Sequence, residues 1–172
     1  RYMDEKLWDK NNEPGKTFNA TYPEGDWENA REVKIKDGYE QRIMDFQMVD
    51  ANGIDLTDSI LSLDTPVLLH ISKDLAAMST AWQDDFNALG SAVAGAGWAM
   101  YGLTNATAEE HAVYATQEGT TYPFLTCDQT ELKIVVRANP GLVLIQNGVV
   151  VEKWAGRDVP SPEDLTAFLS GR

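Results

Sequence analysis

The stretch VLLHISKDLAAMSTAW, residues 67–82, decides the fold prediction. Its first part, VLLHIS, is a nearly unbroken apolar run, which is typical of a strand covered on both faces. Further apolar residues recur at spacings of three and four, at Leu75, Met78, Trp82, Phe86, Leu89 and Val93. This periodicity predicts one long amphipathic helix that follows the strand and begins near Leu75.

The segments on either side continue the alternation of strands and helices. Upstream, IMDFQMVDANGIDL, residues 43–56, predicts a hairpin because the Asn-Gly pair at 52–53 is a strong turn signal. Downstream, apolar runs at residues 98–104 and 122–127 predict two more strands. A second hairpin is expected over residues 140–154, again turning at an Asn-Gly pair.

Capping residues mark three further helices. Thr107 and Glu110 form a capping-box pattern before a helix that Gly119 closes. Asp128 precedes a short helix, and Ser161 opens the last one. This order indicates an α/β sandwich of three layers, with a mixed central sheet, an N-terminal β-hairpin and helices on both faces.

Residues 1–42 differ in composition from the rest of the chain. They are polar and contain NNEPGK and YPEGDW, which are rich in turn-forming residues. They also hold Trp8, Phe18, Tyr22 and Trp27, which argue against free disorder because disordered tails are poor in aromatic residues. We therefore expect an arm or tether over residues 1–42 and one folded domain over residues 43–172.

Composition argues against several classes of function. The 172 residues carry a formal net charge of −13, which opposes the phosphate attraction that nucleic-acid binding depends on. No stretch reaches the ~18 to 20 apolar residues of a membrane-spanning helix. The single cysteine, Cys127, excludes an intramolecular disulfide. His70, expected in the core, and His111, expected in solvent, have no acidic ligand at metal-site spacing, so we expect no metal and no cofactor.

Several local phrases, in this order, resemble the thioredoxin superfamily, specifically its TlpA and thiol-peroxidase-like branch. MDFQMVDANGIDLTDSIL is similar to the opening hairpin of that branch, and YGLTNATAEEHAVYATQEGTTYPFLTCD to its inserted strand–helix–strand. NPGLVLIQNGVVVEKWAG is similar to the segment that carries the family's cis-proline, a position that Pro140 takes here. The resemblance covers residues 43–169 and implies a thioredoxin-like fold.

A narrower resemblance concerns residues 122–160, YPFLTCDQTELKIVVRANPGLVLIQNGVVVEKWAGRDVP. This segment resembles the soluble C-terminal domain of DoxX-type membrane proteins from Bacteroidetes, in which the domain follows several transmembrane helices. The resemblance implies a membrane-anchored domain on the periplasmic side, with the membrane domain of the same polypeptide as a partner. It would also explain a chain that begins at Arg1 rather than at a methionine.

The residues that would carry redox chemistry are absent from the positions that the resemblance indicates. Active relatives have Trp-Cys-x-x-Cys at the start of the helix after the first central strand, where the helix dipole lowers the pKa of the first thiol. In this chain the two cysteine positions fall at Ala76 and Ser79, and no cysteine precedes Cys127. Alanine has no nucleophile, and a serine hydroxyl without a base is too weakly acidic to replace a thiolate. We therefore expect no dithiol exchange.

The first functional hypothesis is a binding module. In the family, the backbone beside the cis-proline pairs with an extended peptide, a contact that needs no thiol. The expected partner-binding residues are Asp74, Ala76, Ser79, Asn139 and Pro140. Two of them have simpler roles open to them, because Asp74 can cap the helix and Pro140 can shape a turn.

Two alternatives come from other classes. A monothiol oxidoreductase or peroxidase would use Cys127 as its nucleophile, although a free cysteine is more often a small buried hydrophobe. Asp128 and Glu131 close by also disfavour a thiolate there. The third hypothesis is a structural cap that orders a membrane domain or its oligomer.

Overall fold

The structure is a computed structural model that describes residues 46–171. The predicted arm, residues 1–42, lies outside this range, so the domain boundary stays a prediction. Within the range, no helix combines the length and the apolar character that crossing a bilayer requires.

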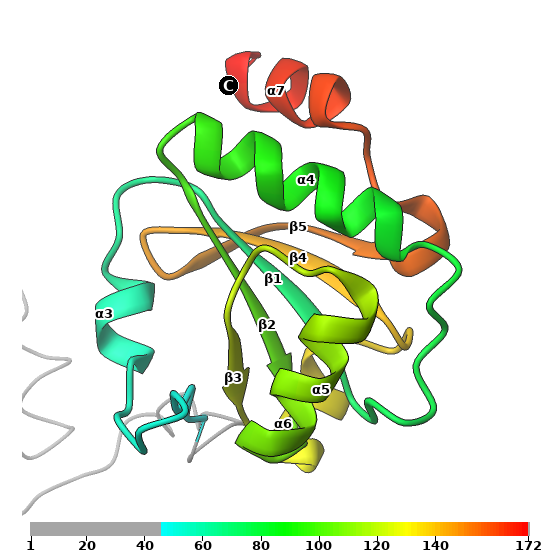
Figure 1. The fold of residues 1–172 in the computed structure, drawn as a ribbon. Coiled ribbons are helices and arrows are strands. Elements are labelled where there is room, and N and C mark those ends of the chain that lie inside the picture. The colour runs from blue at the N-terminus through cyan, green and yellow to red at the C-terminus, as the bar shows by residue number, and fades with distance from the viewer. Residues whose placement is uncertain (1–45, 172) are drawn as a thin grey trace, which may run out of the picture. The chain divides into compact units, whose positions relative to one another are not determined.

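The sheet is built around β1 (Val67–Ser72), whose residues are all buried, as its apolar sequence predicts. On one side it pairs in parallel with β2 (Ala99–Thr104), which pairs in parallel with β3 (Phe124–Thr126). On the other side it pairs antiparallel with β4 (Gly141–Gln146), and β4 continues antiparallel to β5 (Val149–Ala155). The spatial order is β3-β2-β1-β4-β5 (Figure 1).

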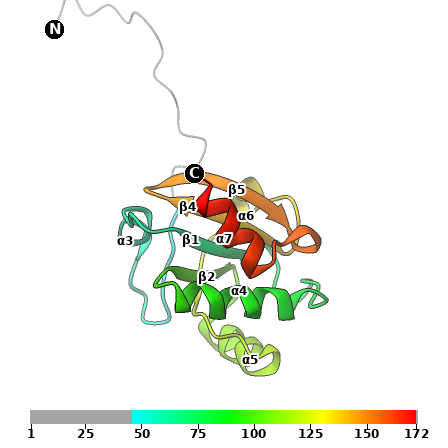
Figure 2. The same cartoon turned by 90° about the horizontal axis from the view of Figure 1, so that it is seen from above.

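Helices cover both faces of this sheet, which confirms the predicted three-layer α/β sandwich (Figures 1 and 2). Their bounds are α3 Thr57–Leu61, α4 Gln83–Gly95, α5 Ala108–Glu118, α6 Gln129–Val135 and α7 Pro162–Ser170, with a short 3-10 helix, η1, at Gly156–Asp158. Residues of α3 and α6 pack on one face, and residues of α4, α5 and α7 on the other. Helix α7 lies beside α4 in both views.

Alternation along β1 divides the interior into two cores. The α3/α6-side core consists of Met48, Ile60, Val67, Leu69, Ile71, Leu103, Leu125, Cys127, Leu132, Val136, Val143 and Ile145. The α4/α5-side core consists of Leu68, Met78, Phe86, Leu89, Val93, Met100, Tyr114, Tyr122, Phe124, Leu142, Leu144 and Leu165. Since successive strand residues face opposite sides of a sheet, each buried strand contributes to both cores.

Gly102 in β2 makes room for the centre of the α4/α5-side core. It pairs with Phe124 on β3, and a Cβ at residue 102 would lie 2.3 Å from the Cδ1 atom of that ring. The ring can therefore lie over the strand, where it contacts His70, His111 and Tyr114. Glycine is required here because any larger residue would push the phenyl ring out of the core.

The capping predictions for three helices are confirmed. At α5 the Thr107 hydroxyl accepts from the Glu110 N–H and the carboxylate of Glu110 accepts from the Thr107 N–H, while Gly119 ends the helix in a left-handed conformation. The Asp128 carboxylate accepts from Thr130 N–H before α6. The Ser161 hydroxyl accepts from the backbone N–H at residue 164 before α7.

The predicted start of the long helix near Leu75 is wrong, because α4 begins at Gln83. The intervening segment, residues 73–82, forms a loop of successive turns, in which Asp74 accepts from the Ala77 N–H at 3.1 Å. The Ser79 hydroxyl accepts from the Ala81 N–H at 3.4 Å. Serine and aspartate side chains offer the backbone such local alternatives to a helix, so apolar spacing alone overestimated its length.

The predicted opening hairpin is reduced to a tight reversal. The turn at residues 52–53 is confirmed, and Leu56 N–H donates to Met48 C=O at 2.8 Å. From residue 46 onward, however, the two arms are joined in a ladder only by an isolated bridge from Val49 to Asp55. The second arm cannot extend because the Asp55 carboxylate accepts from the Thr57 N–H and directs the chain into α3. Val49 also bridges Thr126 at the end of β3.

Candidate functional site

The loop of residues 73–82 holds three of the predicted binding residues. Asp74, Ala76 and Ser79 are exposed there, whereas Met78 between them is buried in the α4/α5-side core. Because α4 begins at Gln83, neither Ala76 nor Ser79 lies at a helix start. The helix-dipole argument that we applied to these two positions from the sequence therefore does not hold in this chain.

Asn139 holds the start of this loop through its side-chain amide. Its Oδ1 accepts from the Lys73 N–H at 3.0 Å and from the Ser72 hydroxyl at 3.2 Å. Its Nδ2 donates to the Asp74 C=O at 2.9 Å. The last residue of β1 and the two residues that follow it are thus fixed to the residue that precedes Pro140, so the side chain of Asn139 positions the loop and is not open to a partner.

Residues around α6 complete this attachment. Gln129 Nε2 donates to the Lys73 C=O at 3.0 Å, and the Lys73 ammonium donates to the Arg137 C=O. Lys133 in turn donates to Gln129 Oε1 at 2.8 Å. The side chains of Gln129 in α6 and Asn139 before β4 therefore fix the path of the loop as it leaves β1.

The bond between Asn139 and Pro140 is cis, as the resemblance implies. Pro140 itself is buried, and its C=O accepts from the Gly156 N–H at 3.0 Å. A Cβ on Gly156 would lie 2.9 Å from Pro140 Cγ, so the proline ring is covered by backbone and does not line an open surface. Within the described residues, however, no hydrogen bond occupies the peptide N–H or C=O of Asn139.

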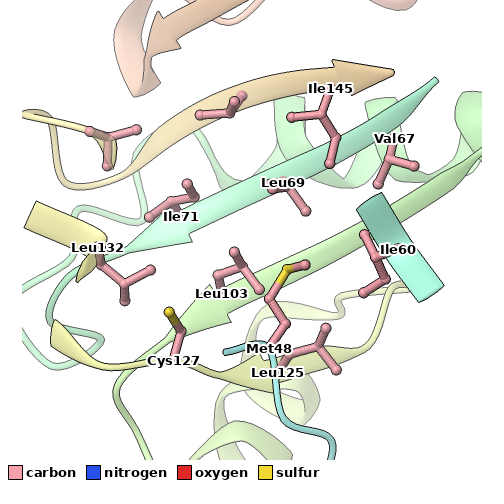
Figure 3. Packing of buried hydrophobic residues seen from close by; sticks show 12 residues of the cluster. Met48, Ile60, Val67, Leu69, Ile71, Leu103, Leu125, Cys127, Leu132 and Ile145 are labelled. Atoms are coloured by element: carbon pink, nitrogen blue, oxygen red, sulfur yellow. The ribbon is translucent and has the colours of Figure 1, made fainter. Parts of the chain in front are cut away.

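Cys127 follows β3 directly, at the sheet edge where the sequence places it, but its side chain is only 3% exposed. It belongs to the α3/α6-side core and lies beside Leu103 and Leu132 (Figure 3). Burial raises the pKa of this thiol to about 12, and the Asp128 and Glu131 carboxylates add to the rise. Cys127 is thus a protonated core residue at neutral pH, on the opposite face of the sheet from Met78.

His70 takes part in a buried polar network that the sequence did not reveal. Its ring stacks on Phe86 with centroids 3.9 Å apart, and its Nδ1 lies 2.7 Å from the Tyr122 hydroxyl. That hydroxyl also accepts from Gln83 Nε2 at 3.1 Å, and Tyr114 donates to Gln83 Oε1 at 2.6 Å. The Tyr122 hydroxyl therefore connects His70 to Gln83, and Gln83 connects it to Tyr114.

Of the two histidines, only His111 differs from its predicted environment. His70 is fully buried as expected, but its Nε2 has no hydrogen-bond partner among the described residues, and burial lowers its pKa to about 3. His111 is buried rather than solvated, because α5 turns it toward Phe124, with ring centroids 5.6 Å apart. Burial lowers its pKa as well, against the opposing charge of Glu110.

A pocket of about 550 Å³ lies between residues 75–80 and α5, and we call it the loop–α5 pocket. Its apolar lining comes from Leu75, Ala76, Met78, Val113 and Tyr114. Its charged lining comes from Glu109, Glu110 and Glu118, and no lysine or arginine lines it. Sequence reasoning missed this site. The available signal was Val113, an apolar residue of α5 that is 56% exposed and lies off the stripe formed by His111 and Tyr114.

The predicted binding residues are brought together only in part. Asp74 and Asn139 are joined by a hydrogen bond, and Ala76 lines the loop–α5 pocket on the same loop. Ser79 does not line that pocket, and the Pro140 ring is covered. Across residues 46–171, no three His, Cys, Asp or Glu side chains are grouped so that they could hold a metal ion.

Comparison with known proteins gives relatives by structure alone, since no family model and no curated protein matches the chain. The bacterioferritin comigratory protein of Xanthomonas campestris, described for alkyl peroxide reduction, shares 17% identity over 73% of this chain and 90% of its own, with a TM-score of 0.53. A secreted Mycobacterium tuberculosis disulfide oxidoreductase homologous to E. coli DsbE shares 11% identity over 74% and 96%, with a TM-score of 0.53.

StoA from Bacillus subtilis gives a similar result, with 13% identity over 72% of this chain and 95% of its own and a TM-score of 0.52. Identities this low establish the fold and nothing finer. The fold is thioredoxin-like, as the sequence resemblance implied.

Proposed function

We propose that this chain is a thioredoxin-like binding domain without thiol–disulfide chemistry, which holds an extended peptide at the backbone of Asn139. One observation carries the proposal: the peptide groups of Asn139 beside cis-Pro140 have no hydrogen-bond partner in the described structure, while the only thiol of the chain is buried in the α3/α6-side core. An extended peptide adds main-chain hydrogen bonds to such groups and needs no cysteine.

The attachment of the loop supports this role. The side chain of Asn139 holds Ser72, Lys73 and Asp74 through three hydrogen bonds, so the segment beside its free peptide groups is ordered before a partner binds. A site ordered before binding loses little conformational entropy when the partner arrives.

We further propose that the domain is the soluble part of a DoxX-type membrane protein on the periplasmic side, a proposal that rests on the sequence resemblance. Several apolar segments of about 20 residues encoded upstream of Arg1 would support it, and their absence would refute it.

The monothiol alternative has little support from the geometry. A nucleophilic cysteine needs a stabilised thiolate with access to substrate, and Cys127 has a raised pKa and a buried side chain. No observation favours a peroxidase over a binding domain.

Two measurements test the proposal on the full chain. Insulin reduction by dithiothreitol should proceed at the same rate with and without the protein, and an accelerated rate would refute the absence of redox chemistry. Selection from a phage-displayed library of random dodecapeptides should enrich extended sequences. Synthetic versions of the enriched peptides should shift the backbone amide resonances of Lys73, Asn139 and Gly141. Peptides that bind without shifting these resonances would refute binding at the Asn139 backbone.

A further inference from the structure

We propose that the loop–α5 pocket receives a lysine or arginine side chain of the bound peptide, so that the domain selects cationic segments. This inference rests on the proposed function, because it assigns a specificity to the partner that Asn139 would hold. The two sites share one loop, since Asp74 accepts from the Asn139 amide and Ala76 lines the pocket.

The lining of the pocket defines the chemistry of its occupant. Met78, Val113 and Tyr114 offer apolar surface, against which the alkyl stem of a long side chain packs. Glu109 and Glu118 offer carboxylates to the charged end of the same side chain. A volume of about 550 Å³ is within the range of pockets that bury small ligands, so it also admits the apolar neighbours of the basic residue.

Among the described residues, no lysine or arginine forms an ion pair with the carboxylates of the pocket. Within residues 46–171 the only ion pair joins Arg157 and Asp158, which line no part of this pocket. The Glu110 carboxylate accepts hydrogen bonds from the Thr107 N–H and hydroxyl, and these lower its pKa, so it stays anionic. The negative charge of Glu118 contributes to the raised pKa of Tyr114. The charge of the pocket is therefore complementary to a cation.

Three heptapeptides with acetylated and amidated ends, which differ only in a central Arg, norleucine or Glu, distinguish the contribution of charge to the binding affinity from that of apolar contact. Titration of the full chain, followed by backbone amide resonances, should give the affinity order Arg, then norleucine, then Glu. The Arg peptide should shift Ala76, Val113 and Glu118 together with Asn139, and its advantage should shrink at high salt because the carboxylates are near the surface.

Matched variants test the role of the carboxylates. Glu109→Gln and Glu118→Gln should each weaken the Arg peptide about twofold to fivefold and leave the norleucine peptide unchanged. Glu163→Gln is the control, because Glu163 occupies the same first-turn position in α7 as Glu109 in α5 and lines no part of the pocket. Val113→Ser, at an exposed residue, should weaken the Arg and norleucine peptides alike.

The outcomes distinguish this inference from the proposed function. Equal affinities of the three peptides, with shifts at Asn139, would overturn the charge selection and leave the binding domain standing. Shifts at Ala76, Val113 and Glu118 without any at Asn139 would uphold the pocket and overturn the backbone site. Absence of binding by all three peptides would overturn both.

Discussion

Cys127 shows at the scale of one residue why a cysteine at the edge of an α/β sheet is not by itself a site. Its backbone N–H donates to the Thr104 C=O at 2.8 Å, which fixes the residue just beyond the end of β3. From there its side chain points into the α3/α6-side core, beside Leu132. The position matches that of a ligand-binding residue, but the direction of the side chain gives it a packing role.

Alkylation of this thiol should be slow in the folded protein. With the pKa of Cys127 raised to about 12, its thiolate fraction at pH 8 is lower than that of an unfolded thiol by roughly three orders of magnitude. Iodoacetamide labelling at pH 8, followed by mass spectrometry, should therefore be at least about a hundredfold slower in buffer than in guanidinium. A folded-state midpoint below the ordinary ~8.5 would contradict this and revive the monothiol enzyme.

His70 should make the fold sensitive to mild acid. Its pKa is about 3 in the folded state and about 6.5 in the unfolded state, so between these values the unfolded chain binds the extra proton. The stability that depends on a neutral His70 is therefore fully present above pH 6.5 and is lost progressively as the pH falls toward 3. From this residue alone the free energy of unfolding should decrease by roughly 2 kcal/mol between pH 7 and pH 5.

Urea unfolding of His70→Leu at pH 7 and pH 5 checks this prediction. The variant should lose most of the wild-type difference between the two pH values, because the titrating group is gone. His111→Leu is the control, since His111 is also buried but its lowered pKa is partly offset by Glu110. An unchanged pH dependence in His70→Leu would mean that another group carries the acid sensitivity.

At the scale of elements, the loop between β1 and α4 depends on one amide. Asn139→Ala removes all three hydrogen bonds to Ser72, Lys73 and Asp74 and should lower the free energy of unfolding by about 1–3 kcal/mol. Asn139→Asp keeps an acceptor for Lys73 and Ser72 but places a carboxylate oxygen against the Asp74 C=O, so it should keep part of the stability.

Amide hydrogen exchange at Lys73, together with urea unfolding, distinguishes the two variants of Asn139. The Lys73 amide should exchange fastest in Asn139→Ala, because only that variant leaves it without an acceptor. If Asn139→Asp proved the less stable of the two, repulsion at the Asp74 C=O would outweigh the retained hydrogen bonds, which would contradict the expected order.

The elements that the sequence predicted well are those whose signals are local. Thr107 with Glu110, Asp128 and Ser161 marked helix starts correctly, because a cap is a contact between residues two or three positions apart. The buried strand β1 was equally plain from its apolar run. Both signals lie within a few residues along the chain, so a single sequence is enough to recognise them.

The candidate site was predicted less well because it depends on contacts distant in the sequence. The binding role of the Asn139 backbone stays a prediction, but the sequence did not reveal that the Asn139 side chain bonds to residues 72–74 across the fold. Tyr114, Gln83 and Tyr122 form one network although they lie on separate elements. No spacing rule connects such residues, and the loop–α5 pocket arises from the same kind of distant packing.

For the molecule as a whole, the α3/α6-side core shows that the first described residues are part of the folded domain. Met48 is fully buried in the α3/α6-side core, and Val49 exchanges two backbone hydrogen bonds with Thr126 at 2.9 and 2.8 Å. These contacts lie just after the predicted boundary at residue 42. The segment around Met48 therefore belongs to the domain, since it fills the core and pairs with the end of β3.

Two truncations test this boundary. A chain that starts at residue 43 keeps every described core residue. Its free energy of unfolding should therefore lie within about 0.5 kcal/mol of that of the full chain. A chain that starts at residue 51 lacks Met48 and should lose about 2–5 kcal/mol, and Met48→Ala in the full chain should reproduce much of that loss. Urea unfolding gives the free energies, and sedimentation velocity gives the state of association. A large loss on removing residues 1–42 alone would show that the arm stabilises the domain, and a change in association alone would favour the structural cap over the binding module.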